Sequence, residues 1–350
     1  MSIVVQKYFE KFHAKIRQSR IEHHSDLIKK RDKLVDELRI FLKEKFKGTE
    51  KGIPAFSVFN QGSYSMGTGV IPIERDYDID VGLCFDFSKD DYDPIEVKSW
   101  VNDAFKDKYS VTVKRPCVRV QFTEKGEECY HVDFAIYAGT NWDNRKYLAK
   151  GYLNSKDGTE DFSKKWEASD PDGVRNAIKD KFRIEEEKRQ AKRIIRYLKR
   201  WKDIHFSTDG GTPTGIAITA LILECFQPIM TIDAFTKEVT QVNDLEAMRL
   251  FIEAVLRKFN SFDNSIHVYL PVAPGNDLFA KMNKSENQLK HFKVKIEVLN
   301  KALNSAKNEV APEKACEILA GILGEDFEIP SLAETAQYKP KAFSRSSESA

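Results

Sequence analysis

Asp78 and Asp80 lie two residues apart in the segment DYDIDVG, between apolar residues. Alternate side chains of a β-strand point to the same face, so a strand here presents both carboxylates together and turns Ile79 to the other side. Carboxylates this close repel each other unless a cation lies between them. Because Mg²⁺ prefers such oxygen ligands with substrate phosphates, the pair predicts a metal site rather than a solvated strand end. Asp76 has the same parity and is an alternative ligand in place of Asp80, although Arg75 and the turn-like IPIERD favour a position before the strand.

A third carboxylate, Asp133, interrupts the otherwise apolar strand pattern HVDFAIYA. A buried acid is costly unless it is paired or bound to a cation. Asp133 is therefore either a further ligand of a two-metal site or the partner of an arginine such as Arg119.

A glycine- and serine-rich segment, GSYSMGTG, runs from Gly62 to Gly69 directly after a strand pattern. Glycines let the backbone approach a ligand closely, and the N–H groups at the start of a helix attract phosphate. The Ser63 hydroxyl adds a donor. The segment is either a phosphate-binding turn that opens a helix or an ordinary Gly/Ser turn.

The elements that must position these residues change in type along the chain. Residues 1–47 are helix-rich, and an α/β unit follows, with strands expected at 55–60, 77–85, 110–114, 118–122 and 130–138 and a helix at 94–109. Helices are then expected at 176–206, 212–226, 242–259, 284–308 and 312–323, the second of them capped by Thr212 or Thr214. Residues 175–203 hold about twelve Lys/Arg and about five Asp/Glu, an excess of about +7.

The composition excludes several classes of protein. Of the 350 residues, 41% are hydrophobic and 31% charged, the balance of a globular chain, and no apolar run is long enough for a bilayer. The net charge of +2 argues against binding to long nucleic acid, which requires a strong basic excess. The N-terminus lacks a signal-like apolar core, and no cysteines have CxxC spacing, so we expect a cytoplasmic protein without disulfides.

Four segments together resemble a known family. GSYSMGT, YDIDVG, HVDFAIYA and PTGIAITAL occur in an order similar to that of the polymerase-β-like nucleotidyltransferases. In detail they resemble the CD-NTases, bacterial synthases of cyclic oligonucleotides in antiphage defence that are related to cGAS. The resemblance runs from the helical N-terminus to about residue 325.

The resemblance implies an α/β fold, with a polymerase-β-like nucleotidyltransferase core and a long N-terminal helix packed on a C-terminal helical lobe. Carried onto this chain, residues 1–170 form the catalytic core with the N-terminal helices. Residues 171–330 form the helical lobe that completes the nucleotide-binding cleft, and residues 331–350 are a flexible tail.

The resemblance also implies roles for particular residues. Gly62 and Ser63 hold the phosphates of the donor nucleotide, and Asp78 and Asp80 bind two Mg²⁺ or Mn²⁺ ions. Asp133 binds the metal that activates the attacking hydroxyl and takes its proton.

On the helical lobe, the family places a lysine against the triphosphate and a Ser or Thr at the start of the next helix nearby. Lys199 and Thr214 are the candidates. Arg200 and Lys202 are close rivals of Lys199, because the register is ambiguous.

The implied function is condensation of NTPs, ATP or GTP first, into a cyclic di- or trinucleotide with release of pyrophosphate. The implied partners are an effector that binds the product and a regulator that modifies the C-terminal tail. The alternatives are a linear oligonucleotide synthase, an RNA-terminal nucleotidyltransferase and a catalytically dead scaffold. The intact set of aspartates speaks against the scaffold.

Overall fold

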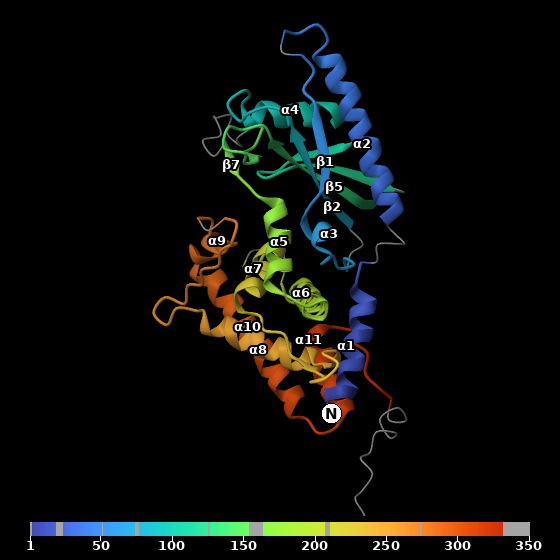
Figure 1. Ribbon diagram of the computed structural model, residues 1–350, viewed down its shortest axis with the longest axis vertical. Coiled ribbons are helices and arrows are strands. Elements are labelled where there is room, and N and C mark those ends of the chain that lie inside the picture. Colours follow the sequence, from blue (N-terminus) through green and yellow to red (C-terminus); the bar gives the residue numbers. More distant parts are fainter. Residues whose placement is uncertain are drawn as a thin grey trace, which may run out of the picture.

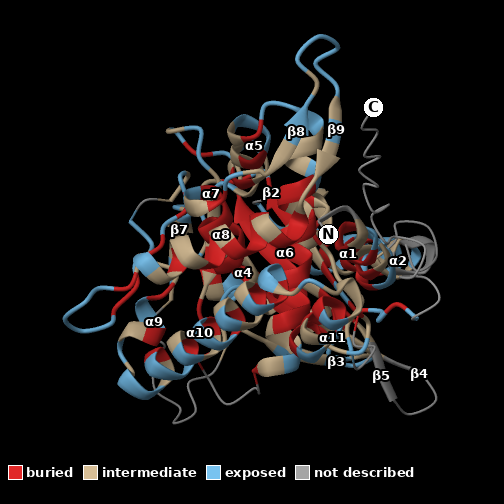
Figure 2. Ribbon diagram, turned by 90° about the horizontal axis from the view of Figure 1, so that it is seen from below, coloured by how far each residue is buried: buried red, intermediate tan, exposed pale blue. Residues whose placement is uncertain are grey.

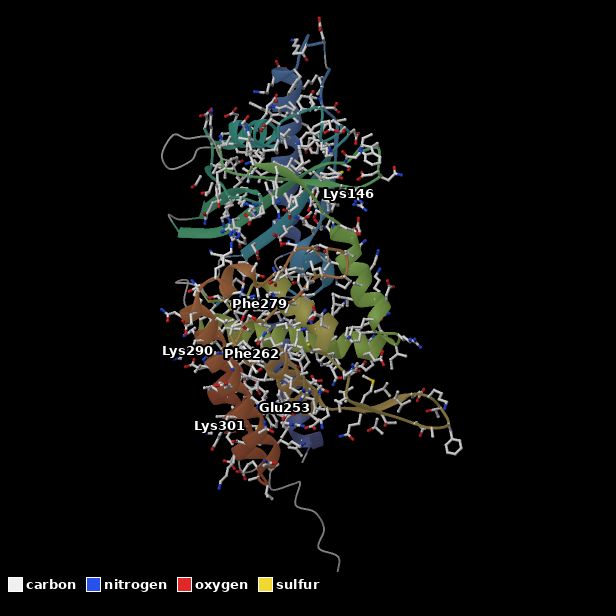
Figure 3. The ribbon with its side chains drawn as sticks, turned by 90° about the vertical axis from the view of Figure 1, so that its left-hand side faces the viewer. Lys146, Glu253, Phe262, Phe279, Lys290 and Lys301 are labelled. Atoms are coloured by element: carbon white, nitrogen blue, oxygen red, sulfur yellow. The ribbon has the colours of Figure 1, made fainter. Side chains whose placement is uncertain are left out.

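The structure is a computed structural model that describes residues 2–18, 24–50, 52–73, 77–124, 127–153, 164–206, 211–273 and 275–331. Asp76 and the expected tail after residue 331 lie outside these ranges. A lobe built on a β-sheet and a lobe built of helices follow each other along the longest axis (Figure 1). The same division appears in the orthogonal view (Figure 3).

The sheet lobe combines one large sheet with three helices. Its elements are α2 (His24–Lys45), β1 (Phe56–Asn60), α3 (Gly62–Met66), β2 (Tyr77–Phe85), α4 (Pro94–Phe105), β3 (Ser110–Val113), β4 (Val118–Glu124), β5 (Glu127–Ala138), β6 (Tyr147–Lys150) and β7 (Lys165–Ala168). The sheet order is β1-β2-β5-β4-β3, with β6 paired to β5 and to β7. β2 and β5 run parallel, and the other pairs are antiparallel. The five strands expected from alternation are confirmed; β6 and β7 were not expected.

The two faces of this sheet have different environments. Ile79, Val81 and Leu83 of β2 belong to a buried cluster with residues of α2 and α4, such as Leu38 and Trp100. These helices therefore cover one face (Figure 1). Residues of the opposite parity along β2 point to the other face, which is where the aspartates lie.

The helical lobe surrounds the long helix α6. Its elements are α1 (Ser2–Ile16), α5 (Pro171–Lys181), α6 (Glu185–His205), α7 (Gly215–Cys225), β8 (Met230–Ile232), β9 (Val239–Val242), α8 (Asp244–Arg257), α9 (Ala280–Asn283), α10 (Glu286–Asn308) and α11 (Pro312–Leu323). Seen from below, α6 is largely buried beneath its neighbours (Figure 2). Among the described helices, none combines the length and the apolar character that a membrane span requires.

The first helix belongs to this lobe and not to the sheet lobe. Phe9 and Phe12 of α1 are fully buried in the same cluster as Tyr197 of α6, whose hydroxyl donates to the Phe9 carbonyl over 3.0 Å. We expected residues 1–170 to form one catalytic part. Instead α2, and not α1, packs on the sheet, because the apolar residues of α1 are buried in the core of the helical lobe.

The single helix expected at 176–206 is two helices, which corrects that prediction. Phe182 adopts an extended conformation (φ −105°, ψ 111°) with its side chain buried. The Glu187 carboxylate then accepts hydrogen bonds from the backbone N–H groups of Arg183 (2.9 Å) and Ile184 (3.4 Å), which starts α6. Burial of one aromatic side chain and this cap together outweigh the helical periodicity.

A buried carboxylate fixes α6 against α8. The side chain of Asp244 is fully buried and accepts hydrogen bonds from Arg193 (2.7 and 3.0 Å), Tyr197 (3.0 Å) and Gln190 (3.1 Å). An ionised carboxylate tolerates such burial only because a guanidinium and neutral donors surround it.

We expect Asp244→Ala to lower the free energy of unfolding by roughly 3–5 kcal/mol, because it leaves the Arg193 charge buried without its main partner. Urea unfolding measures this change. The matched control is Glu253→Ala, which removes a partly exposed partner of Arg249 and should cost about 1 kcal/mol or less. Equal effects of the two changes would contradict the importance of the buried network.

Candidate active site

Strand pairing brings the three expected aspartates together. In the parallel pair β2–β5, Asp80 lies opposite Asp133, and Asp78 lies opposite His131. Residues directly opposite on adjacent strands share a face, so all three carboxylates occupy the face of the sheet that α2 and α4 leave uncovered. Asp78 is exposed, whereas Asp80 and Asp133 are half-buried.

Burial and neighbouring negative charges disfavour the ionised form of Asp80. Burial, followed by the nearby carboxylates of Asp78 and Asp133, raises the pKa of Asp80 to about 7, against the opposing effect of Lys199. Like charges in a site of low polarity disfavour one another's ionised form. A divalent cation beside Asp78 and Asp80 would relieve this repulsion, so their donor set fits a hard metal ion.

Asp133 has a cationic partner inside the protein. Arg119, its cross-strand neighbour on β4, donates to both carboxylate oxygens over 2.7 and 2.8 Å. Burial raises the pKa of Asp133, but the hydrogen bonds and charge of Arg119 outweigh it and hold that pKa below its usual value. The salt bridge considered from the sequence is therefore present. Each carboxylate oxygen keeps a further lone pair, so a metal ion could bind Asp133 either beside Arg119 or in its place.

Within the described residues, no three carboxylate, imidazole or thiol side chains lie close enough together to form a ready metal site. Asp133 is instead hydrogen-bonded to Arg119. The fit to a metal thus rests on the Asp78–Asp80 pair.

The glycine–serine segment forms the short helix α3 against the same strand. Gly62 has a positive φ of 63°, and the preceding Gln61 donates its backbone N–H to the Asp80 carbonyl over 3.1 Å. A Cβ atom on Gly62 would lie 1.8 Å from Asp80 Oδ2. Tyr137 is buried, and its hydroxyl donates to Gln61 Oε1 over 2.8 Å. The turn therefore requires glycine at position 62 for two independent reasons.

We expect Gly62→Ala to lower the free energy of unfolding by roughly 2–3 kcal/mol, since it adds backbone strain and an overlap with Asp80. The control is Gly48→Ala, where φ is 76° but nothing lies within 4 Å of the added Cβ; it should cost about 1 kcal/mol. Thermal unfolding of both variants measures the difference, and equal shifts would show that the contact with Asp80 is unimportant.

A cleft between the lobes gathers most of the expected residues. Its volume is about 420 Å³, and its lining includes the candidates Gly62, Ser63, Asp78, Asp80, Lys199 and Thr214. Asp133 is not among the described residues that line it. Lys202, the rival of Lys199, also lines this cleft, whereas Arg200 instead donates to the Ile71 carbonyl (2.9 Å) and pairs with Asp326 (3.2 Å).

Two helices of the helical lobe supply the polar wall of the cleft. Lys199 of α6 is buried and donates to the Thr68 carbonyl over 3.1 Å. Burial lowers the pKa of Lys199 to about 8, although Asp78 and Asp80 oppose this. Thr214 caps α7, its hydroxyl accepting the Ala217 N–H over 3.2 Å, as expected from the sequence.

The structure adds residues that the sequence did not single out. Gly215 lets Lys199 approach, since a Cβ there would lie 3.3 Å from the lysine Cε. Tyr64 is half-buried and lines a second cavity. No sequence signal distinguished Gly215 from the other glycines, because the position of Lys199 relative to α7 depends on tertiary packing.

Part of the chain is similar to known nucleotidyltransferases. Residues 56–137 match the family model "Cyclic GMP-AMP synthase DncV-like, nucleotidyltransferase domain". A cyclic GMP-AMP synthase of Escherichia albertii is 27% identical over 194 residues, which are 52% of this chain and 38% of that protein. The match thus covers well under half of the curated relative.

Solved structures show the same fold over nearly the whole chain. The cyclic AMP-GMP synthase DncV of Vibrio cholerae superposes with a TM-score of 0.61 at 17% identity, covering 94% of this chain and 90% of its own. The CD-NTase CdnG of Bradyrhizobium diazoefficiens, solved with GTP, gives 0.67 at 10% identity, covering 95% and 98%. The expected polymerase-β-like core with a helical lobe is confirmed.

Proposed function

We propose that this chain, which carries a nucleotidyltransferase domain of the DncV-like type and has the CD-NTase fold, condenses NTPs into a cyclic oligonucleotide and releases pyrophosphate. One observation carries the proposal. Within this fold, the glycine–serine turn, the Asp78–Asp80 pair and Lys199 converge on a single cleft. Phosphoryl transfer uses these groups directly: carboxylates hold the metal ions, a lysine neutralises the phosphates, and backbone and hydroxyl donors position them.

Each polar residue of the cleft has a proposed role in binding phosphate or metal. Ser63, beside the Gly62 turn, donates a hydroxyl hydrogen bond to a donor phosphate, and Lys199 places a positive charge against the triphosphate. Asp78 and Asp80 would hold two Mg²⁺ or Mn²⁺ ions, which when bound neutralise charge on the transferred phosphate. Positioning and charge neutralisation supply most of the rate enhancement in such reactions.

Asp133 is the proposed acceptor of the proton from the attacking ribose hydroxyl. Its pKa lies below the usual value because of Arg119, so it is ionised at neutral pH and able to accept a hydrogen bond. Release of Arg119 from the carboxylate would make it a stronger base.

The substrates are proposed from the solved relatives, and the biological setting from the family that the sequence motifs resemble. ATP and GTP are the first candidates for substrates, because related structures were solved with them. We propose that the enzyme acts in the cytoplasm in antiphage defence, and that its product activates an effector. A regulator that acts on the tail remains a proposal, since that tail lies outside the described residues.

The proposal is tested by incubating the purified chain with labelled ATP, GTP, CTP and UTP and with Mg²⁺ or Mn²⁺. Phosphatase treatment and mass spectrometry then follow, with the Asp78→Asn, Asp80→Asn double variant as control. We expect a phosphatase-resistant species at the mass of a cyclic oligonucleotide from the unmodified chain alone. A phosphatase-sensitive ladder would identify a linear oligonucleotide synthase, and extension of added RNA would identify an RNA-terminal transferase.

A further inference from the structure

One face of α6 is bonded to the segment 67–71, which follows the glycine–serine helix α3 and leads towards β2. Three cations of α6, spaced three and four residues apart and therefore on one face of the helix, donate to backbone carbonyls of this segment. These bonds join Arg196 to Gly67 and Gly69 (3.2 Å for the second), Lys199 to Thr68 (3.1 Å) and Arg200 to Ile71 (2.9 Å). Because hydrogen bonds from charged donors are roughly twice as strong as neutral ones, α6 holds the segment firmly against the helical lobe.

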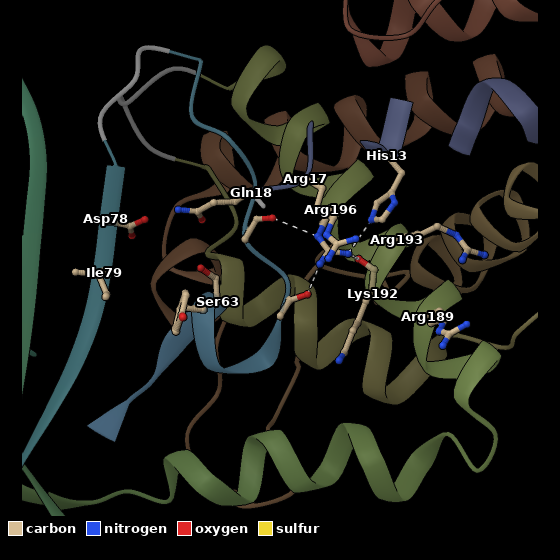
Figure 4. Close-up of a pocket in the computed structure, with 13 residues that line it drawn as sticks. His13, Arg17, Gln18, Ser63, Asp78, Ile79, Arg189, Lys192, Arg193 and Arg196 are labelled. Atoms are coloured by element: carbon tan, nitrogen blue, oxygen red, sulfur yellow. Dashed lines mark hydrogen bonds between the residues drawn. The ribbon is translucent and has the colours of Figure 1, made fainter. Parts of the chain in front are cut away.

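Arg196 makes the bonds that lie closest to α3 along the chain. The residue is 8% exposed, and its guanidinium also donates to His13 Nε2 of α1 over 2.9 Å (Figure 4). Burial and the charge of Arg196 lower the pKa of His13 to about 4, so the imidazole accepts this bond in its neutral form. Among the described residues, Arg196 therefore has only neutral partners, and it does not share its bonds to the segment with a carboxylate.

The start of the segment is bonded back to the phosphate-binding turn. The N–H of Gly67 donates to the Tyr64 carbonyl over 3.1 Å, and the N–H of Thr68 donates to the Ser63 carbonyl over 2.8 Å. Ser63 lines the donor cleft, whereas Arg196 is not among the described residues that line it. An effect of Arg196 on a bound phosphate is therefore expected to pass through this segment.

Lys199 has two competing partners in this arrangement. It donates to the Thr68 carbonyl and also lines the cleft in which the triphosphate is proposed to bind. An ammonium group that turns towards a phosphate weakens its bond to the carbonyl. Arg196, which is bonded to the residues on both sides of Thr68, would then hold this part of the segment in place.

We propose that Arg196 is a positioning residue of the donor site, which fixes the turn at Ser63 by holding the carbonyls of Gly67 and Gly69. The inference rests on the proposed function, in which Ser63 binds a phosphate of the donor nucleotide. A turn that is fixed before binding costs less entropy when the nucleotide arrives, because its donors already point at the ligand.

Amide hydrogen exchange tests the structural part of this proposal without any nucleotide. We expect Arg196→Met to speed exchange at Gly67 and Thr68 roughly tenfold relative to the amides of α4, because the segment opens locally. The matched control is Arg193→Met, the same change three residues earlier on α6, where the arginine pairs with the buried Asp244. It should lower the urea midpoint of global unfolding but leave the relative exchange of these two amides unchanged.

Nucleotide binding tests the functional part. Calorimetry measures the Kd of a non-hydrolysable ATP or GTP with Mg²⁺, expressed per folded molecule. We expect Arg196→Met to raise this Kd roughly tenfold. Arg193→Met and a second control, Arg189→Met, which removes an exposed arginine of the same helix, should change it about twofold at most.

Arg196→Lys separates loss of the bonds from loss of packing. The variant keeps a charged donor, and Lys98 shows that one ammonium group of this chain can donate to several backbone carbonyls at once. Most of the nucleotide affinity and most of the protection from exchange should therefore return. Equal defects in the lysine and methionine variants would mean that the change only disturbs packing, and the positioning role would be wrong.

A double-mutant cycle with Ser63→Ala identifies the route of the effect. If Arg196 acts through the turn, Arg196→Met should weaken binding by only about twofold in the Ser63→Ala chain. Additive losses would show that Arg196 acts on the ligand independently of Ser63, which would overturn the proposal. If the unmodified chain binds no nucleotide, the donor cleft itself is wrong and both proposals fall. Unchanged binding by Arg196→Met contradicts this inference alone.

Discussion

Replacing Asp78 and Asp80 by asparagine is expected to lower the rate of nucleotide condensation by about 1,000-fold or more, because it removes the carboxylates proposed to hold the metal ions. The fold should survive, since both side chains keep their shape. Product formation from labelled NTPs under single-turnover conditions measures the loss. Asp86→Asn is the control: this exposed carboxylate follows directly after β2 and should leave the rate unchanged. A double variant with more than about a tenth of the original rate would contradict the assignment.

The same double variant should be more stable than the unmodified chain in the absence of metal. Asp80 has a pKa of about 7 in the folded chain against 3.8 in the reference state. The folded chain therefore keeps a proton that the unfolded chain releases, and the contribution of Asp80 to stability is lost as the pH rises through this window. We expect the variant to gain roughly 2 kcal/mol at pH 8 and little at pH 4.

Urea unfolding in EDTA at both pH values measures this gain. The comparison is with Asp86→Asn, which removes an exposed charge from the end of the same strand. An equal gain in the two variants would mean that repulsion around Asp80 is weak.

The sequence predicted those parts of the site that depend on local geometry. Strand periodicity alone places Asp78 and Asp80 on one face and Ile79 on the other, and the structure has this arrangement. The cap at Thr214 follows equally from its position before an apolar helix. Both inferences need only the conformation of a few consecutive residues.

Features that depend on long-range packing were not predictable in this way. The alternation of β5 identified Asp133, and Arg119 was named as a possible partner, but the sequence left open whether Asp133 is a metal ligand or pairs with Arg119, because the two become neighbours only through the register of β4. The spacing of apolar residues in α1 indicated an amphipathic helix but did not indicate which lobe this helix packs against. The basic excess of 175–203 was visible, but which of these cations face solvent, Asp244 or the cleft depends on how α6 is rotated.

Lys199→Met is the second change with a large expected effect. It removes the charge proposed to contact the triphosphate, so we expect kcat/KM to fall roughly 100- to 1,000-fold. The chain should remain folded, because methionine fills a similar apolar volume beside Gly215. Lys202, the alternative candidate for this contact, provides the comparison. Lys202→Met removes a cation from the same cleft and should lower kcat/KM about tenfold or less. The reverse order of effects would move the triphosphate contact to Lys202.

The pKa of Lys199 adds a second readout that loss of packing would not produce. Because burial lowers this pKa to about 8, the free enzyme loses the charge as the pH rises from 7 to 9, well before an exposed lysine would. Binding of a non-hydrolysable NTP to the unmodified chain should therefore weaken over this range. The Lys199→Met chain should bind weakly at both pH values. If both chains weakened in parallel, the titrating group would lie elsewhere in the cleft, and the contact assigned to Lys199 would be wrong.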